Sequence, residues 1–503
     1  MTFEGSLLIW ILLSSLVPAV WILFLKEGRH RLRTFVNLAG ASVKLVLVSL
    51  LVHGVLSEQR FEYRVQLLPN LDLVLEADAL AVLFVSLSAV LWLITTVYAI
   101  GYLESSPHRS RFFAFFSLCV FSTVGLALAG NLFTFLVFYE LLTVSTYPLV
   151  VHRGTAKSLQ AGATYLRYTL TGGMLLLLGV AWLRTLAGPI EFTHGGMLMP
   201  LVEQHRGALI TIFWLLIAGL GVKAALVPLH GWLPRAMVAP APVSALLHAV
   251  AVVKAGAFGI VRVIYDVYGP ETVKTLGIGV PLALLASVTI IYGSVRALFQ
   301  DDLKKRLAFS TVSQVSYVVL GAAIYGPVAT IGGVVHLVHQ GLMKITLFFC
   351  AGNYAEGLHV HRISELDGAG KRMPLTSAAF TLGAFGMIGV PPMAGFVSKW
   401  YIGSGALAAG WYWVVGVLIG SSVLNAAYFL PILRRVWFAP GATGHRDEES
   451  RSAPEIHWML LAPPLITAAL ALGAGLLAGA PFSPLAWCRL IAAREYGLSQ
   501  FEP

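Results

Sequence analysis

Apolar stretches of about 20 residues recur along the whole chain, and they restrict its fold more than any other feature. A stretch of this length crosses the hydrocarbon core of a bilayer as a single helix. Only 12% of the 503 residues are charged and 57% are hydrophobic, whereas a soluble domain has roughly 25% charged residues. The sequence therefore predicts an all-α integral membrane protein. We place its fourteen spans near residues 5–25, 38–56, 79–103, 112–129, 131–151, 160–183, 208–231, 242–265, 276–298, 308–325, 327–351, 374–400, 408–433 and 457–479.

The distribution of basic residues predicts the orientation of the spans. Lys and Arg collect in the cytoplasmic loops of membrane proteins, and here alternate loops carry KEGRHRLR, RALFQDDLKKR and HRISELDGAGKR. We therefore expect both termini on the outer side of a prokaryotic cell membrane. The formal net charge of +10 then comes mostly from the Lys and Arg residues of the cytoplasmic loops. Because the basic groups are dispersed over short loops, the sequence does not indicate nucleic-acid binding.

Several charged side chains fall within the predicted spans, where a charge costs about 2.5–3.5 kcal/mol on insertion scales. Lys44 and Arg167 lie close to basic span ends, so their long side chains can reach the membrane interface. Arg167 is also kept as a candidate for a proton path. The candidates deeper within spans are Glu140, Lys223, Lys254 and Lys399, with Lys344 considered below. For these, a structural buried ion pair is the alternative to a proton-carrying role.

Two of the intramembrane lysines lie beside prolines that should interrupt their helices. Pro228 follows Lys223 by five residues, and Pro391 with Pro392 precedes Lys399. Interrupted helices in corresponding places of two halves indicate a transport site, although ordinary proline kinks are the alternative. If spans 4–8 and 9–13 are two five-helix repeats, the interrupted spans 7 and 12 are each the fourth helix of a repeat. The predicted units are residues 1–111, 112–265 (first repeat), 276–433 (second repeat) and 457–503.

A line of polar residues follows one side of the eleventh span in HLVHQGLMK. His336, His339 and Lys344 recur at helical spacing, so they should share one side of the helix. Histidine titrates near neutral pH, which favours a proton relay over a structural hydrogen-bonded seam. No cysteine or carboxylate in the span completes a metal site, so we expect no metal.

Two further histidines lie near the proposed path. His248 precedes Lys254 by one and a half turns, and His230 follows Pro228. Each could serve a proton path, or could satisfy backbone groups that the prolines expose.

The chain carries no signature of its own energy source. The three cysteines form no CxxC, and no P-loop, dinucleotide-binding glycine motif or serine elbow occurs. We therefore expect no cofactor, and an ion gradient or another subunit must drive the process. Burial disfavours a charged amine and a nearby carboxylate favours it, so separating a glutamate from a lysine would move a proton.

Five blocks of the sequence together resemble one membrane-protein superfamily. The chain resembles the proton-translocating antiporter-like subunits shared by complex I, membrane-bound hydrogenases and multi-subunit Mrp cation/proton antiporters. This resemblance implies fourteen helices, two inverted five-helix repeats with broken helices 7 and 12, and a buried polar axis along the membrane plane. The blocks are NLFTFLVFYELLTVSTYPLV (131–150), GVKAALVPLHGWLPRAMVAPAPVSALLHAVAVVKAGAFGIVR (221–262), LKKRLAFSTVSQVSYVVLG (303–321), HLVHQGLMKITLFFCAG (336–352) and GMIGVPPMAGFVSKW (386–400).

The resemblance also implies roles for individual residues. It makes Glu140 the partner of Lys223, Lys254 the link between the two halves, and Lys399 the residue leading to an exit. The histidines of the eleventh helix correspond to His336 and His339. Lysine at 399 departs from relatives that have glutamate there, so the exit route cannot be copied from them.

Within the superfamily, the length of the chain and its YELLTVSTYPLV sequence are most similar to those of the D-type subunit of Mrp antiporters or of hydrogenase subunits. This implies membrane partner subunits, including a second antiporter-like chain, and transport of protons, with sodium left open. The alternatives are a proton-pumping subunit of a redox-driven complex, the membrane subunit of an inorganic-carbon uptake system, and a non-conducting scaffold.

Overall fold

The computed structural model describes residues 3–104, 106–440 and 455–498. Its first part comprises two helices, a β-hairpin and a third helix. The hairpin strands pair antiparallel, with Glu62 opposite Glu76. The bounds are α1 (Phe3–Leu23), α2 (His30–Leu56), β1 (Glu62–Leu68), β2 (Leu71–Glu76) and α3 (Ala79–Tyr102).

The middle of the chain continues as helices, interrupted where the first predicted repeat has its prolines. The bounds are α4 (Arg109–Ala127), α5 (Leu132–Val150), α6 (Ala156–Ala187), α7 (Val202–Ala224), α8 (Trp232–Arg235), α9 (Ala241–Ala249) and α10 (Val252–Arg262), which a π-helical turn (Val263–Tyr268) extends.

The last part forms a second group of long helices and ends in a short one. The bounds are α11 (Pro270–Leu276), α12 (Gly279–Leu298), α13 (Leu303–Ala323), α14 (Pro327–Leu358), α15 (Ala369–Arg372), α16 (Pro374–Ile388), α17 (Ala394–Ala408), α18 (Tyr412–Phe438), α19 (Trp458–Leu476) and α20 (Pro484–Glu495).

The predicted membrane fold is confirmed, because a helix or a broken pair of helices occupies each of the fourteen predicted spans. Within the described residues, twelve helical segments are long and apolar enough to cross a membrane. The two remaining spans are α13, which begins with the polar sequence LKKR, and the broken pair α16 and α17. The division of residues 112–433 into two repeats stays a prediction.

Side-chain caps explain where several spans begin. Asp78 accepts a hydrogen bond from the N–H of Ala81 at the start of α3, and Asn131 accepts one from Thr134 at the start of α5. Each cap satisfies a backbone donor that the first turn of a helix leaves free.

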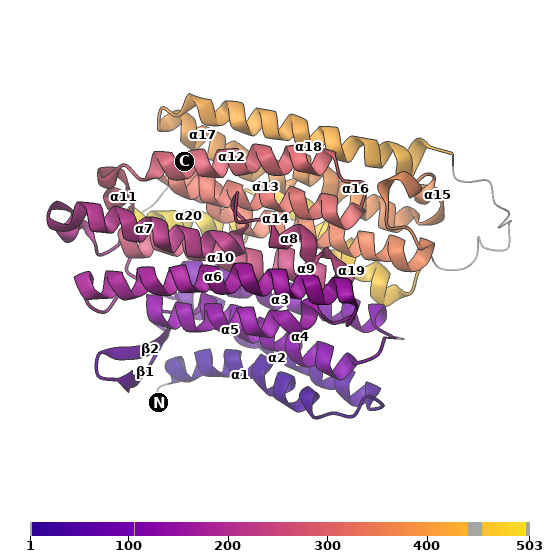
Figure 1. Cartoon of the computed structure of the whole chain (residues 1–503), viewed down its shortest axis with the longest axis horizontal. Helices are drawn as coiled ribbons and strands as arrows, with labels where there is room; N and C mark the ends of the chain where they lie inside the picture. The colour runs from indigo at the N-terminus through magenta and orange to yellow at the C-terminus, as the bar shows by residue number, and fades with distance from the viewer. Residues whose placement is uncertain (1–2, 105, 441–454, 499–503) are drawn as a thin grey trace.

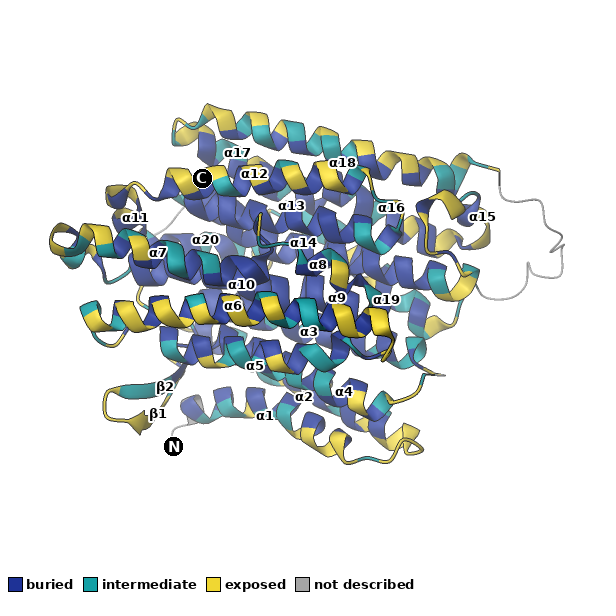
Figure 2. Cartoon of the chain, in the orientation of Figure 1, coloured by how far each residue is buried: buried dark blue, intermediate teal, exposed yellow. Residues whose placement is uncertain are grey.

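Burial separates central from peripheral helices. The segment Ala241–Tyr268 and the central part of Pro327–Leu358 lie fully inside the protein, whereas the apolar helices at the edges expose much of their surface. Figure 2 shows this contrast between buried α10 and α14 and the yellow faces of α6 and α18. An exposed apolar face suits a bilayer, so the polar groups of α10 and α14 lie in the protein interior rather than against lipid.

The two predicted interruptions are present. The seventh span was predicted to continue to residue 231, but α7 ends at Ala224, and Ala225 adopts the left-handed conformation (φ 57°). The twelfth span breaks after α16, where Gly389 has φ 90°. The peptide bonds before Pro228 and Pro392 are cis.

The structure also contains features that the sequence analysis did not predict. The eighth span is broken between α9 and α10, at Val250 and Ala251. The β-hairpin and α20 lie outside the predicted spans. Figure 1 shows the hairpin at the same end of the helix bundle as α11, with α15 at the opposite end.

Candidate functional site

Lys223 lies fully buried in the last turn of α7, directly before the break. Its ammonium group donates a hydrogen bond to the backbone carbonyl of Tyr139 on α5 and lies 3.4 Å from the centroid of the Tyr139 ring. The Tyr139 hydroxyl in turn donates to the carbonyl of Gly219 on α7, at 2.9 Å. The cation is therefore held by a carbonyl dipole and a π-face.

Glu140 is the next residue on α5, but no salt bridge joins its carboxylate to Lys223 in the part of the chain that the structure describes. The predicted pairing of Lys223 with Glu140 therefore stays a prediction, since no direct ion pair joins the two side chains in this conformation. Oε1 of Glu140 is buried and has no hydrogen-bond partner among the described residues. It packs against Gly173 of α6, where an added Cβ would lie only 2.1 Å away. The space beside the carboxylate exists because residue 173 has no side chain.

Lys254 links α10 to α14 through a hydrogen bond. It lies on α10 just after the break, and its ammonium group donates to the carbonyl of Leu337 on α14 at 2.7 Å. A close helix contact positions this turn, because a Cβ at Gly256 would lie 2.2 Å from the backbone nitrogen of Ala224. The helix ends that carry Lys223 and Lys254 therefore pack backbone to backbone.

His336, His339 and Lys344 of α14 are fully buried, and their side chains face different neighbours. Nδ1 of His336 lies 2.7 Å from the hydroxyl of Ser398 on α17. Lys344 donates to the hydroxyl of Ser310 and, at 3.3 Å, to the carbonyl of Leu307, both on α13. His339 lies between them in the sequence, and its ring nitrogens find no hydrogen-bond partner among the described residues.

Lys399 occupies the break between α16 and α17. Its ammonium group donates to the carbonyls of Met387 and Ile388 at 3.2 and 2.8 Å, and to the hydroxyl of Ser422 at 3.0 Å. A helix end leaves carbonyls without intrahelical donors, and Lys399 satisfies two of them at the end of α16. The ammonium group also lies 5.4 Å from the centroid of the Tyr317 ring.

The remaining candidates differ in position. His248 is buried against Phe348, with ring centroids 4.5 Å apart, and half-buried His230 contacts the edge of Tyr292 at 4.9 Å. Arg167 is exposed on α6, so the structure does not bring it to the buried polar residues.

Lys44 differs from its predicted position as well. It is fully buried and donates to the hydroxyl of Ser15 on α1 at 2.7 Å, so the interpretation that it reaches the membrane interface is wrong.

Sequence reasoning missed a buried ion-pair cluster at the end of α10. Arg262 donates to both carboxylate oxygens of Asp78, at 2.5 and 2.7 Å, and to Asp266 at 3.1 Å. Arg262 and Asp266 are four residues apart, which is a helical ion-pair spacing that could have identified half of the cluster. Asp78 comes from a distant segment, and no local pattern could have indicated its contribution.

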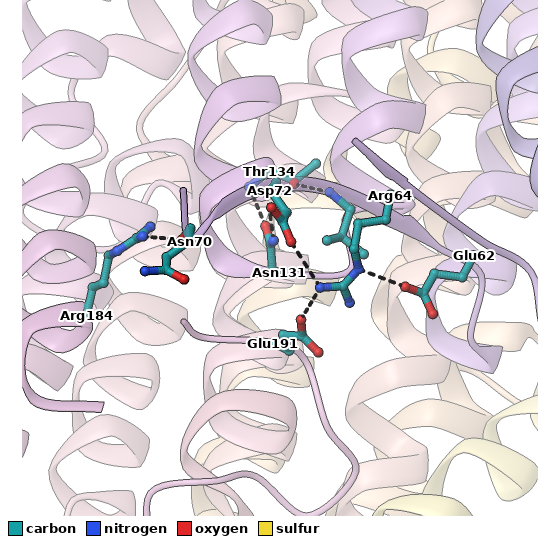
Figure 3. Close-up of polar contacts among 9 residues, drawn as sticks. Glu62, Arg64, Asn70, Asp72, Asn131, Thr134, Arg184 and Glu191 are labelled. Carbon is teal, nitrogen blue, oxygen red and sulfur yellow. Dashed lines mark hydrogen bonds and ion pairs between the residues drawn. The ribbon is translucent and has the colours of Figure 1, made fainter. Parts of the chain in front are cut away.

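A second polar group, exposed rather than buried, anchors the β-hairpin. Arg64 pairs with Glu62, Asp72 and Glu191 at 3.1, 3.3 and 2.7 Å (Figure 3). Arg64, Asp72 and Glu191 border a cavity of about 320 Å³ that α5 and α6 also line, near Asn131.

Comparisons with known proteins agree with this architecture. Residues 129–425 match the family described as NADH:quinone oxidoreductase/Mrp antiporter, TM. NADH-quinone oxidoreductase subunit N from Desulforudis audaxviator is 36% identical over 390 residues, covering 75% of this chain and 76% of the relative. The D-type subunit of the Na(+)/H(+) antiporter from Bacillus subtilis is 27% identical over 421 residues, covering 82% and 83% of the two chains.

A solved structure extends the similarity to the complete fold. A chain of the Mrp complex from Dietzia sp. superposes with a TM-score of 0.86 and 25% identity, covering 99% of this chain and 98% of that chain. The family match covers more than half of the chain and includes Glu140, Lys223, Lys254, His336 and Lys399. This chain is therefore a member of the NADH:quinone oxidoreductase/Mrp antiporter transmembrane family.

Proposed function

We propose that this chain is the proton-translocating subunit of a multi-subunit membrane complex, an Mrp-type antiporter that exchanges a monovalent cation for protons. One observation carries the proposal. Every buried lysine of the polar series donates to backbone carbonyls or hydroxyls, and none of them pairs with a carboxylate in the described part of the chain. These lysines are Lys223, Lys254, Lys344 and Lys399.

Such an arrangement suits a proton carrier better than a structural ion pair. A structural pair keeps both charges permanently compensated, because removing either partner is costly. A carbonyl or hydroxyl can instead hold an ammonium group as an acceptor, and the hydroxyl can also donate to a neutral amine. Lys254, Lys344 and Lys399 can therefore lose their protons without leaving an uncompensated buried carboxylate, whereas the charge of Lys223 interacts with that of Glu140.

The helix breaks supply the movement that the proposal requires. Lys223 lies at the end of α7 and Lys399 holds the end of α16, so a small shift of either helix end changes the acceptors around its ammonium group. In this proposal, Lys223 accepts a proton from the side of Glu140, and Lys254 passes it toward α14. His336, His339 and Lys344 continue the path, which Lys399 ends. In this proposal, His248 and His230 lie beside the path rather than on it.

The Mrp-type assignment gains support from the fold similarity to a chain of the Dietzia sp. Mrp complex and from the similarity to the Bacillus subtilis antiporter chain. It implies membrane partner subunits, with a second antiporter-like chain among them. The basic loops support a prokaryotic cell-membrane location with both termini outside. Sodium is the monovalent cation to test first.

The test is a proton-flux assay on inverted vesicles that contain the intact complex. A pH-sensitive dye reports the response to added sodium, with wild type compared to Lys223→Ala. A sodium-triggered signal that the variant loses supports the proposal. A sodium signal of equal size in the variant rejects the role of Lys223.

The second candidate is a proton-pumping subunit of a redox-driven complex. Its specific support is the 36% identity to an NADH-quinone oxidoreductase subunit N. The same vesicles distinguish the two candidates. A signal that depends on an added electron donor and not on sodium favours the redox-driven complex.

A further inference from the structure

Three side chains that play no part in the proposed proton path meet at the end of the bundle that carries the hairpin. His194 lies in the loop after α6, Asp266 in the π-helical turn after α10, and Glu495 at the end of α20. One ligand atom from each, a ring nitrogen and two carboxylate oxygens, lies within 4.8 Å of the other two. Nδ1 of His194 is 2.7 Å from Oε1 of Glu495.

The backbone holds these residues in place. A Cβ at Gly269 would lie 1.8 Å from the carbonyl oxygen of Gly195, so the loop that carries His194 crosses the π-helical turn in direct backbone contact. Thr193 donates to the carbonyl of Asp266 at 3.2 Å, and Met197 donates to that of Val267 at 3.1 Å. Backbone contacts therefore fix the loop that carries His194 against the turn that carries Asp266.

The charges of the cluster are not balanced by the neighbouring arginine. The side chains of Asp266 and Glu495 are each 1% exposed. Arg262 is the arginine in contact, and Asp78 binds it with both carboxylate oxygens. Asp78, Asp266 and Glu495 are thus three carboxyl groups beside one permanent positive charge, and His194 adds a second positive charge only when it is protonated. Buried carboxylates need a compensating cation, because an uncompensated buried charge costs much free energy.

We propose that His194, Asp266 and Glu495 form a binding site for a divalent transition-metal cation of the Zn²⁺ type. One imidazole and two carboxylates are ligands that Zn²⁺ accepts, with a fourth position left for water. Ca²⁺ and Mg²⁺ require more oxygen ligands than the cluster offers. The His194 side chain is 44% exposed, so a cation can reach the site from solvent.

The site would fasten three distant segments to one another. The loop after α6, the end of α10 and the C-terminal helix α20 contribute one ligand each. The cation would thereby hold α20 onto the bundle, where Trp487 already donates to the carbonyl of Ala79 at 2.7 Å. This inference is independent of the proposed function.

The experiment uses the purified chain within its complex, stripped with a chelator and then dialysed against Zn²⁺. We expect elemental analysis to find one more Zn²⁺ per chain in wild type than in His194→Gln. We expect Glu495→Gln to weaken Zn²⁺ binding as well, and both variants to lower the affinity at least about tenfold. His53→Gln is the matched control, because His53 is an exposed histidine on α2 and is not part of the cluster.

A second readout separates metal binding from a purely ionic contact between His194 and Glu495. Added Zn²⁺ should raise the thermal unfolding midpoint of wild type and of His53→Gln, and leave that of His194→Gln unchanged. Because His194 is partly exposed, its variant should fold even if Glu495→Gln does not. Equal Zn²⁺ content in wild type and His194→Gln, or no bound Zn²⁺ in wild type, would overturn the proposal.

Discussion

The ammonium group of Lys223 lies 3.4 Å from the centroid of the Tyr139 ring and donates to the carbonyl of the same residue. A single residue of α5 thus contributes both a π-face and a carbonyl dipole to the buried cation. A desolvated cation–π contact is worth about 2 kcal/mol, which corresponds to a factor of about 30 in an equilibrium.

We therefore predict that Tyr139→Leu reduces proton flux at least about tenfold, because the ring that stabilises the charged form of Lys223 is lost. Tyr139→Phe is the matched control, since it keeps the ring and removes only the hydroxyl that donates to Gly219. The measurement is dye-reported flux in vesicles with equal amounts of the complex. Equal fluxes in the two variants would show that the ring has no role in transport.

Replacing either charged residue at the start of the path should abolish transport. We expect Lys223→Ala and Glu140→Ala to abolish coupled flux while the complex still assembles. Arg167→Gln is the control, because Arg167 is exposed on α6 and should not carry protons. Flux at the wild-type level in either alanine variant would remove Lys223 or Glu140 from the mechanism.

Substituting Gly173 tests whether proton flux depends on the position of the Glu140 carboxylate. A methyl group at residue 173 would lie 2.1 Å from Oε1, so Gly173→Ala must displace the carboxylate. We predict a loss of flux in Gly173→Ala, and partial recovery when Glu140→Asp is added, because the shorter side chain leaves room for the methyl group. The double-variant cycle measures this coupling, and additive losses in flux would show that the two positions act independently.

Substitutions at Lys399 can distinguish its structural role from a role in proton transfer. Arginine can donate to the carbonyls at the end of α16 but does not lose its proton, because its guanidinium stays charged in proteins. We predict that Lys399→Arg keeps most of the thermal stability and loses flux. Lys399→Met should lose flux and also about 1–3 kcal/mol of stability, the cost of leaving buried acceptors unpaired. Flux retained in Lys399→Arg would argue against proton exchange at this residue.

The buried cluster around Arg262 should dominate stability at its end of the bundle. Arg262→Ala leaves Asp78 and Asp266 without their counter-charge, and removing one partner of a buried pair costs about 3–5 kcal/mol. Arg64→Ala is the comparison, since exposed ion pairs contribute only about 0–1 kcal/mol. Thermal unfolding of the purified complex measures both. Similar losses in the two variants would show that burial does not set the strength of these contacts.

Much of the fold could be predicted from the sequence because the length of an apolar stretch is a local property. Each stretch in lipid must satisfy its own backbone, so helices follow directly. The breaks at spans 7 and 12 were also predicted, from prolines beside Lys223 and Lys399, whereas Pro148 and Pro431 lie inside continuous helices. The break between α9 and α10 at Val250 and Ala251 carries no proline and was missed.

The sequence by itself placed Lys223, Lys254 and Lys399 within apolar spans, and the tertiary structure decided what each of them contacts. Helical spacing places His336 and Lys344 along α14, but only packing directs one toward Ser398 and the other toward Ser310. Lys223 donates to the carbonyl of Tyr139 because the end of α7 meets α5 at that residue.

The cluster of His194, Asp266 and Glu495 is the clearest example of contacts that the sequence alone does not predict. Its members are separated by 72 and 229 residues (266 − 194 and 495 − 266), and no spacing pattern relates them. They meet because a glycine-bearing loop crosses the end of α10 and because α20 packs against α3 and α14. Local periodicity specifies helices, whereas contacts between distant segments depend on the packing of the whole bundle.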